Sequence, residues 1–316
     1  MDIGIAHPLY LLPFDHRASF TSGLLGVTGA PDQAHRREAS DLKMVIWEAF
    51  EYALDHGAPR ESCGVLVDEE YGADVARAAR AAGVTLAMPV EKSGQDEFEL
   101  AYGDEFARHI EDFDPDFVKV LVRYNPQDDA ANNRPQETRL AQLSQWLRAQ
   151  DRRLLFELLI PPTAAQSAQT GDDSLVYEQQ LLPLLIVDAI AALQNAGVEP
   201  DVWKIQGIDD RGGCERAVAQ ARIHGRDQVT CIVLGHGADA ERVRGWLSVA
   251  AGVVGYAGFA AGRTIWHDPL ADYVGGRLDR EAARRRIAGN YLDMIDTYRN
   301  AAKHAIGDTP TTGAIS

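Results

Sequence analysis

Cysteine is scarce in this chain of 316 residues. The three cysteines, Cys63, Cys214 and Cys231, lie far apart and form no Cys-x-x-Cys pair. A disulfide framework and a cysteine knuckle for a metal are therefore excluded, and a reducing cytoplasm is the expected location. Cys231 lies inside an apolar run, where a small core residue is the simplest interpretation.

Positive charge is also in short supply. The chain has 31 Lys and Arg against 47 Asp and Glu, which gives a formal net charge of −16. A surface of this sign repels phosphate backbones and anionic membranes, so nucleic acid is not an expected partner. Lysine is the rarest of the charged residues, because only Lys43, Lys92, Lys119, Lys204 and Lys303 are present. A lysine inside an apolar strand therefore requires an explanation.

Long uninterrupted apolar runs are missing as well. The longest apolar stretch, residues 181–193, contains Pro183 and Asp188, and the N-terminus has no basic region. We therefore expect neither a transmembrane helix nor a signal peptide. The remaining composition, 46% hydrophobic and 25% charged residues, is typical of a soluble protein with a core and excludes a disordered or fibrous chain.

What the sequence does contain is a regular alternation of short apolar runs and longer amphipathic segments. The runs are continuous rather than alternating, which is typical of strands buried on both faces. We expect strands at residues 9–14, 63–67, 85–89, 117–124, 154–159, 202–208, 230–234 and 255–260. We expect helices at residues 41–56, 73–82, 104–113, 135–149, 175–196, 213–224, 240–250 and 280–304.

Eight such units predict a single α/β domain, a (β/α)8 TIM barrel over residues 1–306. A doubly wound open sheet is the alternative, because strand order cannot be derived from one sequence. Residues 307–316 are expected to form a disordered tail. Residues 161–173 are expected to form a long polar loop after the fifth strand, which is either a lid over the site or a solvated insertion without a role.

Two lysines in predicted strands carry the strongest chemical signal. Lys204 lies in Val-Trp-Lys-Ile-Gln and Lys119 in Phe-Val-Lys-Val-Leu. Burial disfavours an ammonium, and a second cation nearby disfavours it further, so such a lysine can become a neutral nucleophile toward carbonyl groups. For a single lysine, a rim position with the ammonium in solvent is the simpler interpretation, but two lysines in two strands favour a site.

Carboxylates lie at or within the same predicted strands. Asp15 follows the first strand and is itself followed by His16 and Arg17, Glu157 lies inside the fifth strand, and residues 68–70 follow the second. A buried Glu157 between Lys119 and Lys204 would have both ammoniums as neighbours, which is suitable for acid/base catalysis. The alternative is an inert cluster of ion pairs.

Glycine-rich turns end the last two predicted strands. Residues 234–239 read Leu-Gly-His-Gly-Ala-Asp, and residues 259–266 read Phe-Ala-Ala-Gly-Arg-Thr-Ile-Trp. Barrels bind phosphate at the loops after strands seven and eight, where backbone N–H groups and a helix N-terminus face the anion. Arg263 would add a charge-assisted contact. Two ordinary tight turns are the alternative. The nine histidines form no HxH or HExxH spacing, so no metal site or other cofactor is expected.

Six sequence blocks resemble, in order, those of the class I aldolase family that contains tagatose-1,6-bisphosphate aldolase. The closest resemblance is to its 2-deoxy-5-keto-gluconate 6-phosphate aldolase branch, which acts in myo-inositol catabolism, and it extends over residues 9–268. The blocks are residues 10–17, 64–72, 118–126, 156–162, 203–207 and 261–266.

This resemblance implies roles for individual residues. It implies that Lys204 forms the Schiff base with Lys119 beside it, that Glu157 is the acid/base carboxylate, and that Asp15 contacts substrate. The substrate- and phosphate-binding residues that we expect are Arg17, Gly235, His236, Gly237, Gly262 and Arg263. One position departs from the family pattern, since Gln206 stands where the pattern has a glutamate.

The reaction that the resemblance implies is cleavage of 2-deoxy-5-keto-gluconate 6-phosphate to dihydroxyacetone phosphate and malonate semialdehyde. The alternatives are the same mechanism on another ketose phosphate, or a sugar-phosphate-binding protein without catalysis. We expect a small-molecule sugar phosphate as partner, neither nucleic acid nor membrane, and a homo-oligomer.

Overall fold

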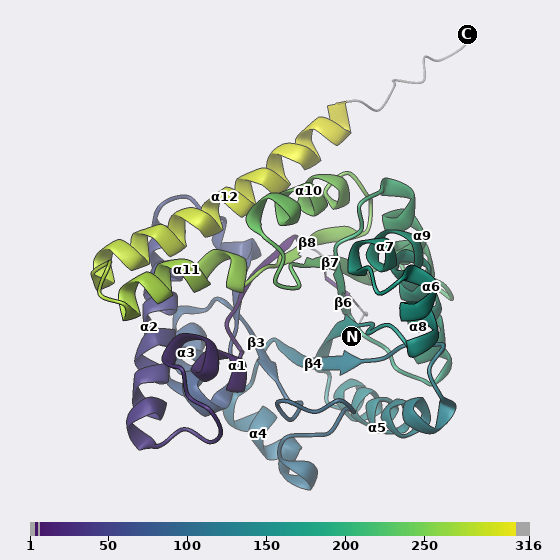
Figure 1. The fold of residues 1–316 in the computed structure, drawn as a ribbon, viewed down its shortest axis with the longest axis horizontal. Helices are drawn as coiled ribbons and strands as arrows, with labels where there is room; N and C mark the ends of the chain where they lie inside the picture. The colour runs from purple at the N-terminus through teal and green to yellow at the C-terminus, as the bar shows by residue number, and fades with distance from the viewer. Residues whose placement is uncertain (1–3, 6, 308–316) are drawn as a thin grey trace.

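The protein is an eight-stranded parallel barrel surrounded by helices (Figure 1), as seen in a computed structural model that describes residues 4, 5 and 7–307. The strands follow one another around the barrel in chain order, and pairing between the first and the last closes it. The predicted (β/α)8 barrel is confirmed, and the open doubly wound sheet is wrong. The strands are β1 Leu9–Pro13, β2 Cys63–Leu66, β3 Thr85–Pro89, β4 Phe117–Arg123, β5 Arg153–Leu159, β6 Val202–Gln206, β7 Thr230–Leu234 and β8 Tyr256–Ala260.

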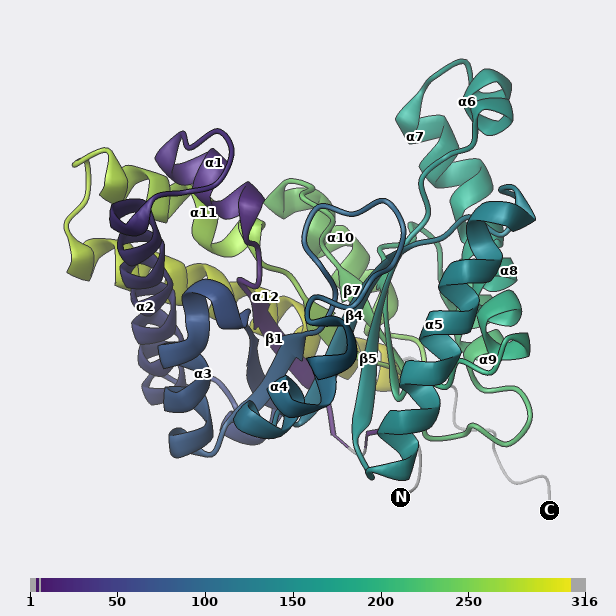
Figure 2. The ribbon, with the colours of Figure 1, turned by 90° about the horizontal axis from the view of Figure 1, so that it is seen from below.

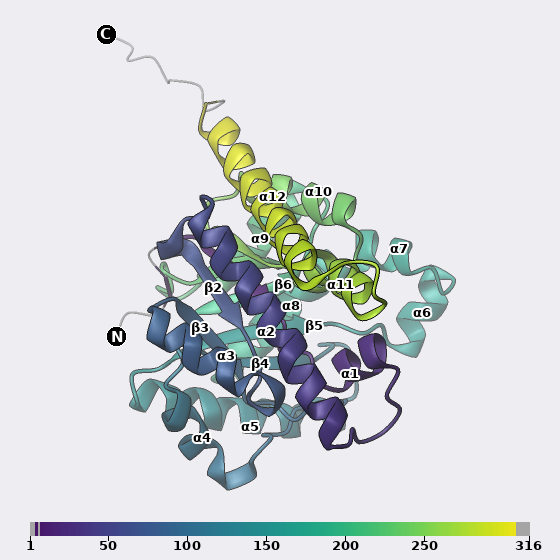
Figure 3. The same ribbon diagram turned by 90° about the vertical axis from the view of Figure 1, so that its left-hand side faces the viewer.

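Helices form the outer layer. The two helices α11 and α12 both follow β8, and α12 packs beside α2 along one side of the barrel (Figure 3). The α-helices are α1 Ala18–Leu25, α2 Gln33–Asp55, α3 Glu69–Ala82, α4 Phe106–Phe113, α5 Ala130–Ala149, α6 Ala164–Thr170, α7 Ser174–Val176, α8 Leu182–Asn195, α9 Arg211–Ala221, α10 Ala240–Ala250, α11 Arg263–Val274 and α12 Arg280–Gly307. The shorter turns are η1 Arg60–Ser62, η2 Gly103–Glu105 and η3 Tyr177–Leu181.

The strands are mostly apolar because they are buried on both faces. One face packs against the helices, and the other fills the barrel. In β4, Phe117 lies in the barrel interior, whereas the neighbouring Val118 belongs to the layer between strands and helices. The interior cluster, as we call it, consists of Leu9, Leu11, Leu66, Ala87, Phe117, Leu155, Val202, Ile232 and Ala260.

Two expectations about local structure were wrong. Residues 161–173 are not an irregular loop, because Thr163 and Gln166 form a capping box that starts α6. The helix expected at residues 175–196 is interrupted by the π-helical turn η3, directly before Pro183 at the start of α8. Proline lacks the N–H that would continue the regular ladder, which explains the irregularity there. Helices α6 and α7 stand at the same end of the barrel as α1 (Figure 2).

The helical segment Ser174–Asn195 is, by length and composition, apolar enough to cross a membrane, and it is the single such segment in residues 4, 5 and 7–307. In the structure, α8 instead packs in the helix layer, with Leu185, Ile186 and Leu193 buried. Of the predicted tail, Gly307 ends α12, and residues 308–316 lie outside the described residues. The cytoplasmic location stays a prediction.

Candidate active site

Three neighbouring strands direct charged side chains into the barrel. In each of β4, β5 and β6, the charged residue lies two positions after a member of the interior cluster, and side chains in a strand alternate between its faces. Glu157 is paired in register with Lys204 across β5 and β6. The buried charged residues in these strands are Lys119, Glu157 and Lys204.

Lys119 lies at the centre of a carboxylate cluster. Its Nζ atom is 2.8 Å from Asp15 Oδ2, 2.7 Å from Glu91 Oε1 and 3.0 Å from Glu157 Oε2. Arg17 completes this group, because its Nη2 donates a 2.7 Å hydrogen bond to the Glu91 carbonyl and lies 3.7 Å from Oε1 of the same residue. With Lys204, three cations therefore face three carboxylates.

Lys204 has a different environment from Lys119. Its Nζ atom is 2.9 Å from Glu157 Oε1, and this carboxylate is shared with Lys119. Lys204 also lines a cavity of about 360 Å³, whereas Lys119 is not among the described residues that line it. Both lysines are buried, so what distinguishes them is that only Lys204 borders space in which a substrate could lie.

The cluster fixes the protonation of its members. Burial disfavours the charged form of Lys119, but Asp15, Glu157 and Glu91 outweigh burial and raise its pKa. Burial likewise disfavours a charged Glu157, yet Lys119 and Lys204 together hold the pKa of Glu157 below its ordinary value. The same balance, with Lys119 as the main partner, lowers the pKa of Asp15. Lys119 therefore stays charged at neutral pH, and Glu157 and Asp15 stay ionised.

Most of the predicted site residues line the cavity beside Lys204. Arg17 is the exception among the predicted binding residues, because it lines an adjoining cavity together with Glu91. The predicted residues that line the Lys204 cavity are Asp15, Glu157, Lys204, Gly235, His236, Gly237, Gly262 and Arg263. The structure therefore brings together residues from five strand ends that lie up to 248 positions apart in the sequence.

The turns after β7 and β8 meet around Arg263. Gly237 has φ of +73°, and a Cβ atom there would lie 2.7 Å from Arg263 Nη2, so glycine allows the guanidinium to approach the backbone. Gly262 is the N-cap of α11, and no side chain caps this helix start. The Ile265 and Trp266 N–H groups donate to the Gly262 carbonyl, which leaves those of Arg263 and Thr264 at the helix start for an anion. Arg263 forms no ion pair with any described residue.

Two residues of this region were missed by sequence reasoning. Glu91 follows β3 and binds Lys119 and Arg17, but the sequence around it has no distinctive motif. Lys43 on α2 is fully buried, and its ammonium donates to the carbonyls of Phe14 and His16 and pairs with Asp68. The sequence feature that could have identified Lys43 is its position on the apolar face of a predicted helix, in a chain with few lysines.

Lys43 also explains the carboxylates after β2. Asp68 pairs with Lys43 and caps α3, and Glu69 Oε2 lies 2.8 Å from His109 Nδ1. Asp68, through Lys43, therefore supports the loop that carries Asp15, whereas Glu69 binds His109 on α4. Neither carboxylate joins the Lys119 cluster. His16 lines the Lys204 cavity, and burial lowers the pKa of its imidazole to about 4, so the ring is neutral at pH 7.

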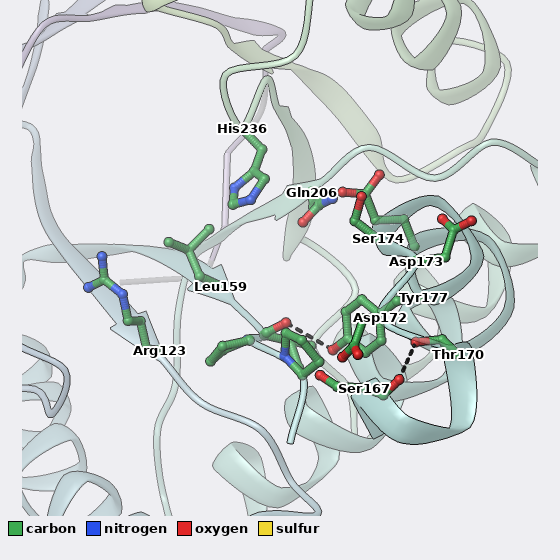
Figure 4. Close-up of a pocket in the computed structure, with 14 residues that line it drawn as sticks. Arg123, Leu159, Ser167, Thr170, Asp172, Asp173, Ser174, Tyr177, Gln206 and His236 are labelled. Atoms are coloured by element: carbon green, nitrogen blue, oxygen red, sulfur yellow. Dashed lines mark hydrogen bonds between the residues drawn. The ribbon is translucent and has the colours of Figure 1, made fainter. Parts of the chain in front are cut away.

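A second chamber of about 430 Å³ adjoins the first, between the ends of β4 to β6 and the α6 to η3 segment (Figure 4). Arg123, Leu159 and His236 line both spaces, and Gln206 and Tyr177 line the second. Tyr177 is held by a 2.9 Å hydrogen bond from its hydroxyl to the Ile160 carbonyl. In the described part of the chain, no group of three or more His, Cys, Asp or Glu side chains is placed to hold a metal ion.

Residues 5–302 match a sequence family described as "Uncharacterized protein conserved in bacteria (DUF2090)". The chain belongs to this family. No curated protein matches this DUF2090 member. Among solved structures, its fold is similar to an archaeal fructose 1,6-bisphosphate aldolase, with 14% identity, a TM-score of 0.57 and coverage of 93% of this chain and 94% of that one. It is also similar to Cgl0159 from Corynebacterium glutamicum (Brevibacterium flavum), with 16% identity, a TM-score of 0.55 and coverage of 90% and 86%.

At these identities the likeness establishes the fold alone, a closed (β/α)8 barrel. It agrees with the predicted aldolase resemblance at the level of architecture. The narrower assignment to the branch that contains tagatose-bisphosphate and deoxyketogluconate-phosphate aldolases concerns substrate and mechanism, and it stays a prediction.

Proposed function

We propose that this DUF2090 protein is a class I aldolase, a carbon–carbon lyase that cleaves a phosphorylated keto sugar acid such as 2-deoxy-5-keto-gluconate 6-phosphate. The observation that carries the proposal is that Lys204 and Glu157 line one cavity with Arg263, and that Glu157 also binds Lys119 behind them. A buried lysine that borders a cavity and shares a carboxylate with a second, charged lysine is suited to carbonyl chemistry.

In the proposed reaction the Lys204 amine adds to the ketone at C5, and water leaves to give an iminium ion. The iminium accepts the electron pair of the C3–C4 bond as that bond breaks, and a carboxylate takes the proton from the C3 hydroxyl. Malonate semialdehyde departs, and the enamine that remains on Lys204 is protonated and hydrolysed to dihydroxyacetone phosphate. Water returns the amine, so the steps balance without a redox cofactor.

Each charged group has a definite part in this proposal. Glu157 Oε1 is 2.9 Å from Lys204 Nζ, so Glu157 is the carboxylate that receives and returns protons at the reacting centre. Lys119 holds Glu157 ionised, which keeps it a base. Asp15, bound to Lys119 at 2.8 Å, lines the cavity and would accept a hydrogen bond from a substrate hydroxyl.

The test of this proposal is chemical trapping. Wild-type protein is incubated with dihydroxyacetone phosphate and borohydride, and the peptide that carries the reduced adduct is identified by mass spectrometry. We expect one adduct, on Lys204. Absence of any adduct, with product formation also undetectable in a coupled assay for dihydroxyacetone phosphate, would favour a sugar-phosphate-binding protein over an aldolase. If the protein forms an adduct on Lys204 but cleaves a different ketose phosphate faster than 2-deoxy-5-keto-gluconate 6-phosphate, the mechanism stands and the substrate assignment is wrong.

Replacing Arg263 with alanine is expected to raise the KM for a phosphorylated substrate more than tenfold. The reason is the loss of a charge-assisted hydrogen bond to phosphate, which contributes about 1.5 to 3 kcal/mol. Steady-state kinetics measures this effect. Arg285→Ala is the matched control, because Arg285 is exposed on α12 and pairs with Glu281. An unchanged KM in Arg263→Ala would show that the substrate phosphate does not bind at Arg263.

A further inference from the structure

Two arginines of the Lys204 cavity have no carboxylate partner among the described residues. They are Arg123, at the end of β4, and Arg263, at the start of α11. Arg17 in the adjoining cavity is bound to Glu91. In a chain with a net charge of −16, carboxylates are plentiful, so a guanidinium at the site without one is available to an external anion. The Arg123 side chain makes one hydrogen bond to a described residue, from Nη1 to the Gln95 carbonyl at 3.0 Å, which anchors the guanidinium without neutralising it.

The two arginines lie on opposite sides of the barrel. In the closed order β1 to β8, strands β4 and β8 are four strands apart in either direction, and β6 with Lys204 lies halfway between them. Arg123 is on the same face of β4 as Lys119, four residues farther toward the open end, which is about 13 Å along a strand. A ligand held at both ends by Arg123 and Arg263 would therefore pass over Lys204.

The surroundings of the two arginines differ in a way that assigns the two ends. Arg263 lies beside the uncapped start of α11 and the glycine turns, which together supply several N–H donors and suit a dianionic phosphate. Arg123 lines one side of the second chamber, and Asp172 and Asp173 lie on its other side (Figure 4). Glu178 also lines this chamber. These carboxylates disfavour a dianion. The planar guanidinium of Arg123 matches the two oxygens of a singly charged carboxylate.

We propose that Arg123 binds a carboxylate at the end of the substrate remote from the phosphate, and that it thereby makes the enzyme select aldehyde acids over neutral or phosphorylated aldehydes. This inference rests on the proposed aldolase function. It adds to that function a specificity-determining residue for the acid end of the substrate.

The test uses the condensation direction, with dihydroxyacetone phosphate and one of three aldehydes. Malonate semialdehyde carries a carboxylate, 3-hydroxypropanal is a neutral aldehyde of the same length, and glyceraldehyde 3-phosphate carries a phosphate. In Arg123→Gln we expect the KM for malonate semialdehyde to rise about 10- to 100-fold, the loss of a charge-assisted bond. The KM for 3-hydroxypropanal is expected to stay within about twofold. Arg123→Lys, which keeps the charge but not the planar fork, is expected to lie between wild type and Arg123→Gln.

The control is Arg134→Gln, since Arg134 is exposed on α5 and outside the lining of both spaces. An equal change for both the acid and the neutral aldehyde, or no change for either, would contradict the role of Arg123. If the wild type prefers glyceraldehyde 3-phosphate and this preference disappears in Arg123→Gln, Arg123 binds a phosphate rather than a carboxylate. That result would overturn the proposal. Trapping of dihydroxyacetone phosphate on Lys204 distinguishes a failure of the aldolase function from a failure of the role of Arg123. If wild type forms no adduct, the aldolase function fails, whereas a normal adduct with unaltered aldehyde selection removes only the inference about Arg123.

Discussion

Replacing Lys204 with alanine is expected to abolish both borohydride trapping and turnover, with turnover reduced roughly 10⁴-fold or more, the scale that accompanies loss of a covalent nucleophile. Lys204 is the buried lysine that lines the cavity, and its one carboxylate partner is shared with Lys119. No other group in the cluster is placed to form an imine there, because Lys119 is enclosed by three carboxylates at 2.7 to 3.0 Å.

The measurement combines mass spectrometry of the trapped protein with a coupled assay for dihydroxyacetone phosphate. Lys92→Ala is the matched control, because Lys92 is an exposed lysine that pairs with Glu99 at 3.2 Å. Lys204→Met serves as a second variant that preserves most of the side-chain volume, and a thermal melt of both variants shows whether the barrel has folded. An adduct that maps to Lys119 in wild type, or trapping that persists in a folded Lys204→Met, would overturn the assignment.

Replacing Lys119 with methionine is expected to lower the free energy of unfolding at pH 7 by about 3 to 5 kcal/mol. The substitution keeps the length of the side chain but leaves Asp15, Glu91 and Glu157 buried without their shared cation. Removing one partner of a buried ion cluster is costly because the remaining charges keep their desolvation penalty. The matched control is Lys92→Met at the surface, for which a change within about 0.5 kcal/mol is expected.

The sign of the pH dependence follows from the protonation of the cluster. In the wild type the raised pKa of Lys119 means that its contribution to stability is complete at pH 7 and is lost only as the pH rises toward that pKa. In Lys119→Met, burial without the cation raises the pKa values of the carboxylates, so they take up protons as the pH falls. The stability difference from wild type should therefore shrink between pH 7 and pH 5.

Urea unfolding at the two pH values measures this difference. A stability loss below about 1 kcal/mol, or a loss that grows as the pH falls, would show that Lys119 does not neutralise this cluster.

Trapping of the Lys119→Met variant adds an independent readout. A folded Lys119→Met should still form an adduct on Lys204, but only at higher pH than the wild type, because this variant lacks the second cation that shares Glu157 with Lys204.

The sequence determined the architecture and most of the site. Eight apolar runs that alternate with helices predicted eight parallel strands buried on both faces, and the observed strand bounds agree within two residues at each end. The closure of these strands into a barrel was seen only in the structure. Lys119, Glu157, Lys204 and Arg263 could be singled out because a charge inside, or just after, an apolar strand is costly unless it has a function or a partner. Hydrophobic patterning did not predict helix α6, which begins with a capping box at Thr163, or the π-helical turn before Pro183.

Only the tertiary structure decided which face of each strand points inward and which lysine borders free space. The sequence of a strand that is apolar on both faces does not show which residues point into the barrel. For β4 this is known only from the structure, in which Phe117 packs in the barrel interior. Closure through β1 and β8 placed Arg123 opposite Arg263, a relation between residues 140 positions apart that no local pattern encodes. Glu91 became part of the site for the same reason, because its carboxylate meets Lys119 only once the barrel has closed.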